Sequence, residues 1–323
     1  MNFLIFLNFR DASIFFYLNF YVEDDFSIKN IILDENYTVD IVDDILYEDK
    51  IRADIKEYNQ RMLEDTEQGH WSLWNFNSEV FENPLEIELG EKYVARNPAS
   101  SIVDGVVGID FGTKSTVVVY QENNVKTHPM RIGTGDLSTE IKSYHYENPT
   151  IMEFNNLEKF IAEYNSRNGR PFTEWKDLTI SHTAFHSMME SSTDNFNSYT
   201  SDLKQWAGNK NRKLKIVDKN SYIVDLPSFI DLKEGEINPI ELYAYYIGLY
   251  INNMRNGVYL EYFLSFPVTY SKEVKEKIRY SFEVGLKKSL PIGVLKDEES
   301  MKKFKVVQGS NEPAAYAVTA LLE

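Results

Sequence analysis

Six residues at positions 110–115, Asp-Phe-Gly-Thr-Lys-Ser, combine residue types that can hold a phosphate together with its metal ion. Gly112 has no side chain to block an anion approaching backbone N–H groups, and the hydroxyls of Thr113 and Ser115 can add hydrogen bonds. Asp110 ends an apolar run, where an unpaired carboxylate is costly. A hydrated Mg²⁺, which takes only one or two carboxylates, would supply the missing partner. Asp and Gly also occur in hairpin turns for geometry alone, so this turn by itself leaves a structural role open.

Two apolar runs flank the turn and predict the strands that position it. Val106, Val107 and Ile109 precede the turn, residues 116–120 follow it, and both runs consist of strand-forming residues. A short polar break between two such runs indicates an antiparallel hairpin.

The residue pattern predicts further strands and helices downstream of this hairpin. Expected strands cover residues 125–132, 147–154, 212–218, 222–232 and 258–270. Expected helices cover residues 157–167, 198–209 (closed by Gly208), 236–254 and 272–288. The run at 258–270 has almost no charge, which is typical of a strand buried in the middle of a sheet. Residues 304–323 predict a strand, a polar turn and a final helix that starts at Asn311.

Two of these helices carry clear start signals. Asn238 is the expected N-cap of the helix at 236–254, with Pro239 at the first helical position and Glu241 completing a capping box. Ser271 is the expected N-cap of the next helix. That helix has one apolar face, formed by Val274, Ile278 and Phe282.

Composition narrows the class of protein. The 323 residues carry a net charge of −16, which repels nucleic acid phosphates and argues against a nucleic-acid-binding protein. The chain has no cysteine, so disulfides and Cys-ligated zinc or iron–sulfur sites are excluded. These features favour a cytoplasmic protein.

The first 22 residues are very apolar. Arg10 and Asp11 interrupt this run in its middle, and no small-residue cleavage site follows it, which argues against a membrane helix and a signal peptide. Its aromatic and β-branched residues predict two strands instead, at residues 3–9 and 13–22.

Residues 1–100 are expected to form a small α+β module of unknown role. Its other expected elements are strands at 27–33 and 37–42 and a helix at 48–67. Trp71 and Trp74 indicate either a small hydrophobic core or, less simply, a groove for a partner. Residues 95–105 are rich in small and turn-forming residues and predict a linker.

Four segments, in order, resemble the nucleotide-binding domain of the heat-shock protein 70 (DnaK-like) chaperones, part of the actin-like ATPase superfamily. Residues 105–120 resemble the first phosphate loop, and residues 201–209 resemble the segment that carries the catalytic lysine. Residues 263–286 are similar to the strand–proline–helix segment, and residues 306–322 to the "connect 1" region. The implied fold for residues 105–323 is an α/β (α+β) mixed sheet with flanking helices, the ribonuclease-H-like lobe I.

The resemblance implies ATP or ADP with Mg²⁺ as ligands. Asp110 would hold Mg²⁺ through water, Lys204 would stand beside the γ-phosphate and the attacking water, and Glu312 would orient that water. Phosphoryl transfer to water depends on charge neutralisation and on an oriented nucleophile. Pro267 would be the conformational switch. The residues expected to hold the phosphates are Gly112, Thr113, Lys114 and Ser115.

The chain departs from the family pattern in three ways. Lys114 stands where the chaperones usually have a second threonine, and residues 1–100 have no counterpart. No second phosphate loop, adenosine segment or peptide-binding domain occurs before Glu323. We therefore expect a partial nucleotide-binding domain that binds ATP weakly by itself and hydrolyses it in a complete protein, with client proteins or co-chaperones as partners. The alternative is a non-catalytic scaffold or interaction module that retains the fold.

Two other clusters have simpler explanations. His182, His186 and Glu190 would share one helical face and could bind Zn²⁺, but Thr183 stands where the zincin motif needs glutamate. A basic cluster is expected to be a solvated hairpin rather than a site for an acidic partner. Its members are Lys204, Lys210, Arg212, Lys213 and Lys215.

Overall fold

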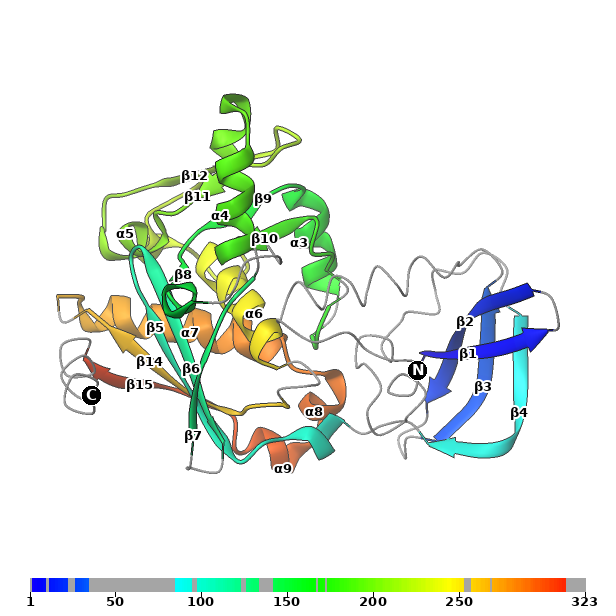
Figure 1. Ribbon diagram of the computed structural model, residues 1–323. Helices are drawn as coiled ribbons and strands as arrows, with labels where there is room; N and C mark the ends of the chain where they lie inside the picture. Colours follow the sequence, from blue (N-terminus) through cyan, green and yellow to red (C-terminus); the bar gives the residue numbers. More distant parts are fainter. Residues whose placement is uncertain are drawn as a thin grey trace.

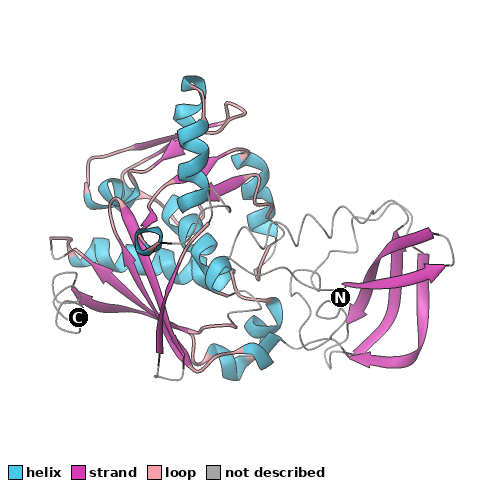
Figure 2. Cartoon of the chain, viewed as in Figure 1, coloured by secondary structure: helices cyan, strands magenta, loops and turns pink. Residues whose placement is uncertain are grey.

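A computed structural model gives the arrangement of most of the chain. It describes residues 2–9, 12–22, 27–34, 85–94, 98–122, 126–133, 142–166, 168–171, 173–252, 257–267 and 269–311. Among the described residues up to position 94, all lie in strands, whereas later residues mix helices and strands (Figure 2).

The N-terminal strands form a sheet of their own. They are β1 (Asn2–Phe9), β2 (Ala12–Val22), β3 (Ser27–Asp34) and β4 (Leu85–Val94). They pair antiparallel in the order β1-β2-β3-β4, so the predicted strands at 3–9, 13–22 and 27–33 are confirmed. The fourth strand was missed by the sequence analysis. The expected strand at 37–42, the helix at 48–67 and both tryptophans lie outside the described residues.

The larger sheet is mixed, and it sets the α/β character of residues 98–311 (Figure 1). Its strands are β5 (Gly105–Phe111), β6 (Ser115–Glu122), β7 (Lys126–Met130), β8 (Asn148–Pro149), β14 (Glu261–Phe266) and β15 (Lys305–Asn311). The strand order is β15-β14-β5-β6-β7, with β8 also paired to β6. Strands β5, β6 and β7 are antiparallel, which confirms the predicted hairpin, while β14 is parallel to both β5 and β15.

Shorter strands form two small sheets beside this one. The first, in the order β10-β9-β11, contains β9 (Met152–Phe154), β10 (Leu178–Ile180) and β11 (Tyr199–Thr200). The second pairs β12 (Leu214–Val217) with β13 (Ile223–Leu226). The single strand expected at 147–154 is thus split into β8 and β9, and the one expected at 222–232 ends at Leu226.

The helices predicted at 157–167, 236–254 and 272–288 are confirmed, whereas the one predicted at 198–209 is shortened to Leu203–Gly208 and is preceded by a strand. They are α3 (Leu157–Ser166), α4 (Ser181–Glu190), α5 (Leu203–Gly208), α6 (Pro239–Ile251), α7 (Lys272–Lys288), α8 (Ile292–Lys296) and α9 (Glu298–Met301). The 3₁₀ turns are η3 (Pro98–Ser101), η4 (Ser143–Tyr146), η5 (Thr193–Ser198) and η6 (Phe229–Asp231). Helices α4, α8 and α9 were not predicted as elements. No helix of the described part is long and apolar enough to cross a membrane.

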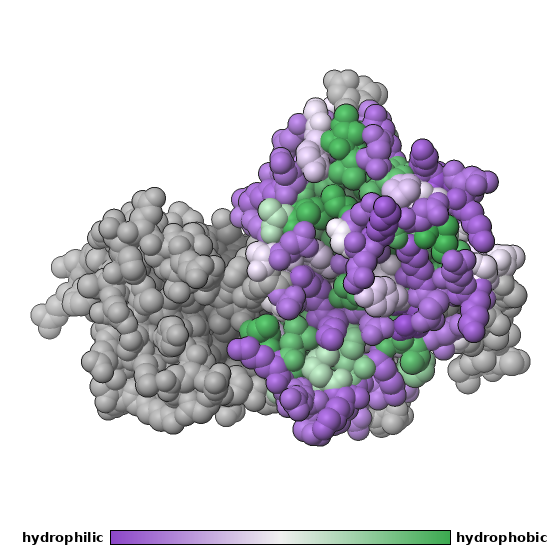
Figure 3. Space-filling model, turned by 180° about the vertical axis from the view of Figure 1, so that it is seen from behind, coloured by the Kyte–Doolittle hydropathy of each residue, from purple (hydrophilic) through white to green (hydrophobic). Residues whose placement is uncertain are grey.

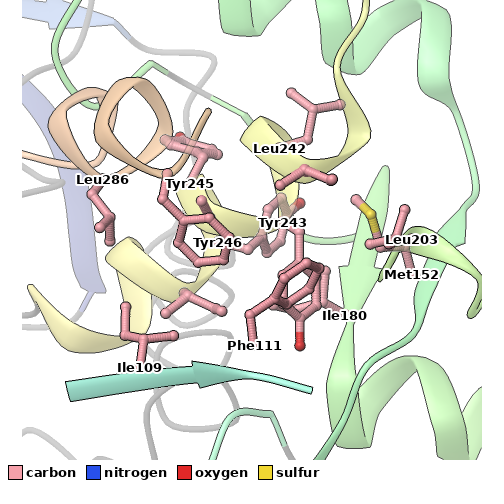
Figure 4. Packing of buried hydrophobic residues seen from close by; sticks show 14 of the residues in the cluster. Ile109, Phe111, Met152, Ile180, Leu203, Leu242, Tyr243, Tyr245, Tyr246 and Leu286 are labelled. Carbon is pink, nitrogen blue, oxygen red and sulfur yellow. The ribbon is translucent and has the colours of Figure 1, made fainter. Parts of the chain in front are cut away.

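Helices α6 and α7 pack on one face of the large sheet. In β5 the residues Val107, Ile109 and Phe111 are buried while their neighbours are not, so this strand has one covered face. The Phe111 ring lies 5.8 Å from Tyr243 of α6 and 5.3 Å from Phe282 of α7. Figure 4 shows Phe111 and Tyr243, together with Leu286 of α7, among the buried side chains between the strand and the helices. Every residue of α6 except Glu241 is buried, so α6 is the central helix of the core.

The predicted N-caps are confirmed, but the capping box is not. The Asn238 side chain accepts hydrogen bonds from the backbone N–H groups of Ile240 and Glu241, and Ser271 accepts one from Val274. The carboxylate of Glu241 instead accepts a hydrogen bond from the hydroxyl of Tyr164 at 2.8 Å. A tertiary partner has replaced the local one.

Two expectations about the C-terminal strands are wrong. Strand β14 is central, but Phe263 is exposed, so only one face of this strand is fully covered. Strand β15 continues through Asn311, where a polar turn was expected, because Asn311 pairs with Phe266 of β14. Tertiary pairing overrides the turn propensity of this segment. The rest of the expected final helix lies outside the described residues.

A glycine permits the close approach of α6 and α7. A Cβ atom on Gly285 would overlap the carbonyl oxygen of Glu241 and would lie 2.7 Å from the backbone nitrogen of Tyr245. Both atoms belong to the backbone of α6, so neither can rotate away. The packing of the two helices therefore requires glycine at this position.

Replacing Gly285 with alanine should destabilise the fold by about 1–3 kcal/mol, because the two helices must move apart. Urea unfolding followed by circular dichroism measures this change. Lys287→Ala, at an exposed position of the same helix, is the matched control and should change the free energy of unfolding by less than about 0.5 kcal/mol. Equal stability of the two variants would contradict the close-packing argument.

Candidate functional site

Asp110 lies on the open face of β5, at the carboxyl end of the strand. It alternates with the buried residues Ile109 and Phe111 and is exposed, so the expectation of a buried carboxylate is wrong. Its Oδ1 accepts a hydrogen bond from the hydroxyl of Ser265, the residue beside it in β14. A hydroxyl group of the neighbouring strand therefore supplies part of the interaction that was expected from a metal ion.

A chain of buried hydroxyl groups fixes the turn that follows Asp110. Tyr243 of α6 donates to Thr116 at 3.0 Å, and the hydroxyls of Thr116 and Thr150 lie 2.9 Å apart. Thr150 in turn donates to the carbonyl oxygen of Gly112 at 3.0 Å. Burial raises the pKa of Tyr243 to about 12, so it remains a neutral donor at physiological pH.

Thr150 also determines how the turn presents its backbone. Its N–H donates to the carbonyl oxygen of Lys114 at 2.9 Å, so the carbonyls of Gly112 and Lys114 both point toward Thr150. All described peptide bonds are trans, and in a trans peptide the next N–H points the opposite way. The N–H groups of Thr113 and Ser115 therefore point away from Thr150. The side chains of Thr113 and Lys114 are exposed.

Lys204 lies on α5, which contacts the segment that follows β14. It is buried, and its backbone carbonyl accepts a hydrogen bond of 2.7 Å from the hydroxyl of Tyr270. Tyr270 follows β14 by four residues and is held by its own N–H to the carbonyl of Pro267. No ion pair between Lys204 and Asp110 occurs in the described part of the chain.

The segment 265–270 thus connects most of the predicted site. Ser265 contacts Asp110, Pro267 follows two residues later, and Tyr270 contacts Lys204. Strands β5, β14 and β15 are parallel, so their carboxyl ends lie at one edge of the sheet, where ligands of open α/β sheets usually bind. Glu312 lies outside the described residues, directly after Asn311, which pairs with Phe266.

The described residues suit a hydrated cation better than a fully protein-coordinated one. Among them, no three His, Cys, Asp or Glu side chains converge on a metal-binding position. Asp110 offers one carboxylate oxygen beyond its contact with Ser265. Mg²⁺ usually keeps several waters and takes one or two carboxylates, so this donor set fits Mg²⁺ that arrives with a phosphate ligand.

The histidine set on α4 does not converge. The Nε2 atom of His182 lies 2.7 Å from the carbonyl oxygen of His145, and burial lowers the pKa of His182. His186 turns to Glu190, at 3.4 Å, so the first histidine faces a different partner from the other two residues.

The basic cluster is solvated, apart from Lys204. Lys210, Lys213 and Lys215 are exposed, and Arg212 forms an ion pair with Asp202. Figure 3 shows that hydrophilic side chains cover much of one face of the described region. The cluster is thus largely solvated as predicted, but it is not a hairpin: Lys204 lies on the buried helix α5, and most of the other members lie in the connection from α5 to β12.

A buried carboxylate that the sequence analysis missed is Glu153 of β9. It accepts hydrogen bonds from Lys219 at 2.5 Å and from three hydroxyl groups. These belong to Ser187, Thr179 and Tyr199, at 2.6, 2.7 and 2.9 Å. Burial opposes ionisation, but these four donors outweigh it and lower the pKa of Glu153. With its oxygens occupied by donors from several elements, Glu153 stabilises the fold; an acid within the apolar run 151–154 was the available sequence signal.

Replacing Thr150 with valine should destabilise the protein by about 1–3 kcal/mol and loosen the 110–115 turn, because the carbonyl of Gly112 and the hydroxyl of Thr116 lose a partner. Chemical denaturation and amide hydrogen exchange of the turn measure both effects. The control Thr127→Val changes an exposed threonine on β7. Unchanged exchange of the turn in the Thr150 variant would contradict the anchoring role.

Glu153 should contribute to the pH dependence of stability. Its folded pKa lies below the ordinary value of 4.5, so its contribution is present above that value and is lost as pH falls through the folded pKa. We expect Glu153→Gln to lose about 2–4 kcal/mol at pH 7 and progressively less as the pH falls below 4.5 through the folded pKa. Urea unfolding across this range measures the difference.

Glu276→Gln is the matched control for this experiment. The hydrogen bond from Arg279 lowers the pKa of Glu276 as well, but this carboxylate is exposed, so its contribution to stability is small. A loss in the Glu153 variant that stays constant over the whole pH range in which the Glu153 carboxylate becomes protonated would show that ionisation of Glu153 is not its source.

No protein-family model matches the chain, and no curated protein matches it in sequence. The site must therefore be interpreted from its own geometry.

Proposed function

We propose that residues 105–323 form the nucleotide-binding lobe of an ATPase that resembles the heat-shock protein 70 chaperones, with a ribonuclease-H-like, actin-like fold. The proposal includes Mg-ATP as ligand, a cytoplasmic location and client proteins or co-chaperones as partners. Residues 1–100 are a separate module in this proposal.

The observation that carries the proposal is the parallel pairing of β14 with β5, which places Ser265 against Asp110. The order of the sheet supports it further, because an antiparallel hairpin comes first and parallel strands reached through helices come later. Both features agree with the lobe expected from the four sequence segments.

The proposed roles follow from the positions of the side chains. The turn 110–115 binds phosphate through the outward N–H of Thr113 and its hydroxyl, and the exposed ammonium of Lys114 adds a positive charge. Asp110 accepts hydrogen bonds from the waters of Mg²⁺. The metal ion neutralises phosphate charge when it is bound. In this proposal, Lys204 and Glu312 act on the γ-phosphate and on water, as the sequence resemblance implies, and Pro267 couples the site to β14.

Isothermal titration of the chain with Mg-ATP tests this proposal. We expect weak binding that requires Mg²⁺ and that Asp110→Ala and Lys204→Ala each weaken about tenfold or more, because each removes a charged contact. Asp104→Ala, at an exposed position just before β5, is the matched control and should bind as the unaltered chain does.

The outcomes separate the two functions considered. Equal ATP affinity of the Asp110 and Asp104 variants, or equal affinity for Mg-ATP and for ATP with EDTA, would contradict the proposed site. Magnesium-dependent binding without hydrolysis, in a version that includes any further lobe, would identify the non-catalytic alternative. Circular dichroism of the Lys204 variant separates loss of binding from loss of fold.

A further inference from the structure

A groove of about 470 Å³ lies between α3, the start of α6, α7 and the loop 232–238. None of its lining residues belongs to the turn 110–115 or to the segment 265–270. It is therefore a separate feature of the fold, and its chemistry does not depend on the proposed ATP site.

Glu241 places a negative charge on the wall of this groove. Only one of its oxygens is engaged by a described donor, the Tyr164 hydroxyl at 2.8 Å, and it forms no ion pair with a described cation. Burial raises the pKa of Glu241, and the hydrogen bond from Tyr164 and the positive charge of Lys288 offset this shift only in part. Its position in the first turn of α6 favours the ionised form.

The two lysines nearest to Glu241 make their direct contacts with other groups. The ammonium of Lys277 donates to the carbonyl oxygens of Ile230 at 2.9 Å and Leu232 at 2.6 Å. The ammonium of Lys288 lies over the Tyr164 ring, 4.8 Å from its centroid. Burial lowers the pKa of both lysines; the negative charge of Glu241 opposes this shift for Lys288, but these two side chains, both in the described part of the chain, form no ion pair.

Two further polar groups of the groove, the side chains of Asn238 and Ser281, are hydrogen-bonded within the protein. Asn238 caps α6 with its oxygen and donates to Ser281 at 2.8 Å, and Ser281 donates to the carbonyl of Lys277. The remaining wall is apolar or aromatic. It is formed by Ile161, Leu232, Ile237, Leu242, Tyr280 and Val284. Tyr280 is 51% exposed, which leaves its ring available to a cation.

We propose that this groove binds a small organic amine, with its ammonium group on Glu241 and an alkyl or aromatic body along the apolar wall. The ammonium would supply the cationic partner that the carboxylate lacks, while burial of the body adds a hydrophobic contribution. On the rim, Glu234 and Glu236 outnumber Lys233, and this balance favours the same sign of ligand charge.

Calorimetric titration of the whole chain with n-hexylamine tests the proposal, with n-hexanol and hexanoate as comparison ligands of similar shape. Hexylamine should bind at least about tenfold more tightly than hexanol, and hexanoate should not bind, because only the amine pairs with the carboxylate. Equal affinity for the amine and the alcohol would overturn the proposal.

Two variants assign binding to this groove. Glu241→Gln keeps an acceptor for Tyr164 but removes the charge, and it should weaken hexylamine binding about tenfold or more. Val284→Trp should block the groove without changing its charge. Glu298→Gln, exposed on α9, is the control and should bind as the unaltered chain does. Undiminished binding by either groove variant would overturn the assignment.

A further titration with a lysine peptide distinguishes a free amine from a lysine side chain of a protein partner. N-acetyl-Ala-Lys-Ala amide carries the same alkylammonium group on a lysine side chain. Weaker binding of this peptide than of hexylamine would support a free amine as the ligand, whereas tighter binding would overturn that assignment in favour of a protein partner. Thermal unfolding of each variant confirms that the fold is retained.

Discussion

The parallel pairing of β14 with β5 is the interaction on which the rest of the structure depends. It aligns Ser265 with Asp110, and the segment that follows reaches α5 through Tyr270. On its other side β14 pairs with β15 as far as Asn311. Without that register, Asp110 and the segment after β14 would not lie together at the edge where these strands end. The pairing in turn needs α6 and α7 to cover one face, which the glycine at position 285 permits.

The polar interactions of the core stabilise the turn from inside the protein and leave its outer residues exposed. The hydroxyls of Tyr243, Thr116 and Thr150 hold the turn from beneath, so its outer residues are not needed to keep its shape. In the small sheet, Glu153 likewise holds the structure together, because this buried acid accepts hydrogen bonds from donors on several elements. Glu241 differs from Glu153, because one of its oxygens remains without a described donor.

Local patterns were predictable from the sequence, and tertiary ones were not. The apolar runs around Asp110 and the capping residues Asn238 and Ser271 depend on nearby residues only, and the structure confirms them. The burial of Asp110 was predicted wrongly because the identity of the covered face depends on which helices pack there. The role of Thr150 could not be foreseen, because its partners Gly112 and Thr116 lie 38 and 34 residues away. Domain boundaries and Glu312 remain predictions.

The contact between Asp110 and Ser265 joins residues 155 positions apart, and this separation has a consequence for folding. The hairpin β5–β6 is local and can form early, whereas β14 can join it only after α3 to α6 have been synthesised. Closing so long a loop is slow, because the chain loses entropy before the contact contributes any stabilising free energy. During translation on the ribosome, the hairpin must therefore remain with its β14-facing edge unpaired, and the edge of the sheet that holds Asp110 and Ser265 is among the last parts of the protein to assemble.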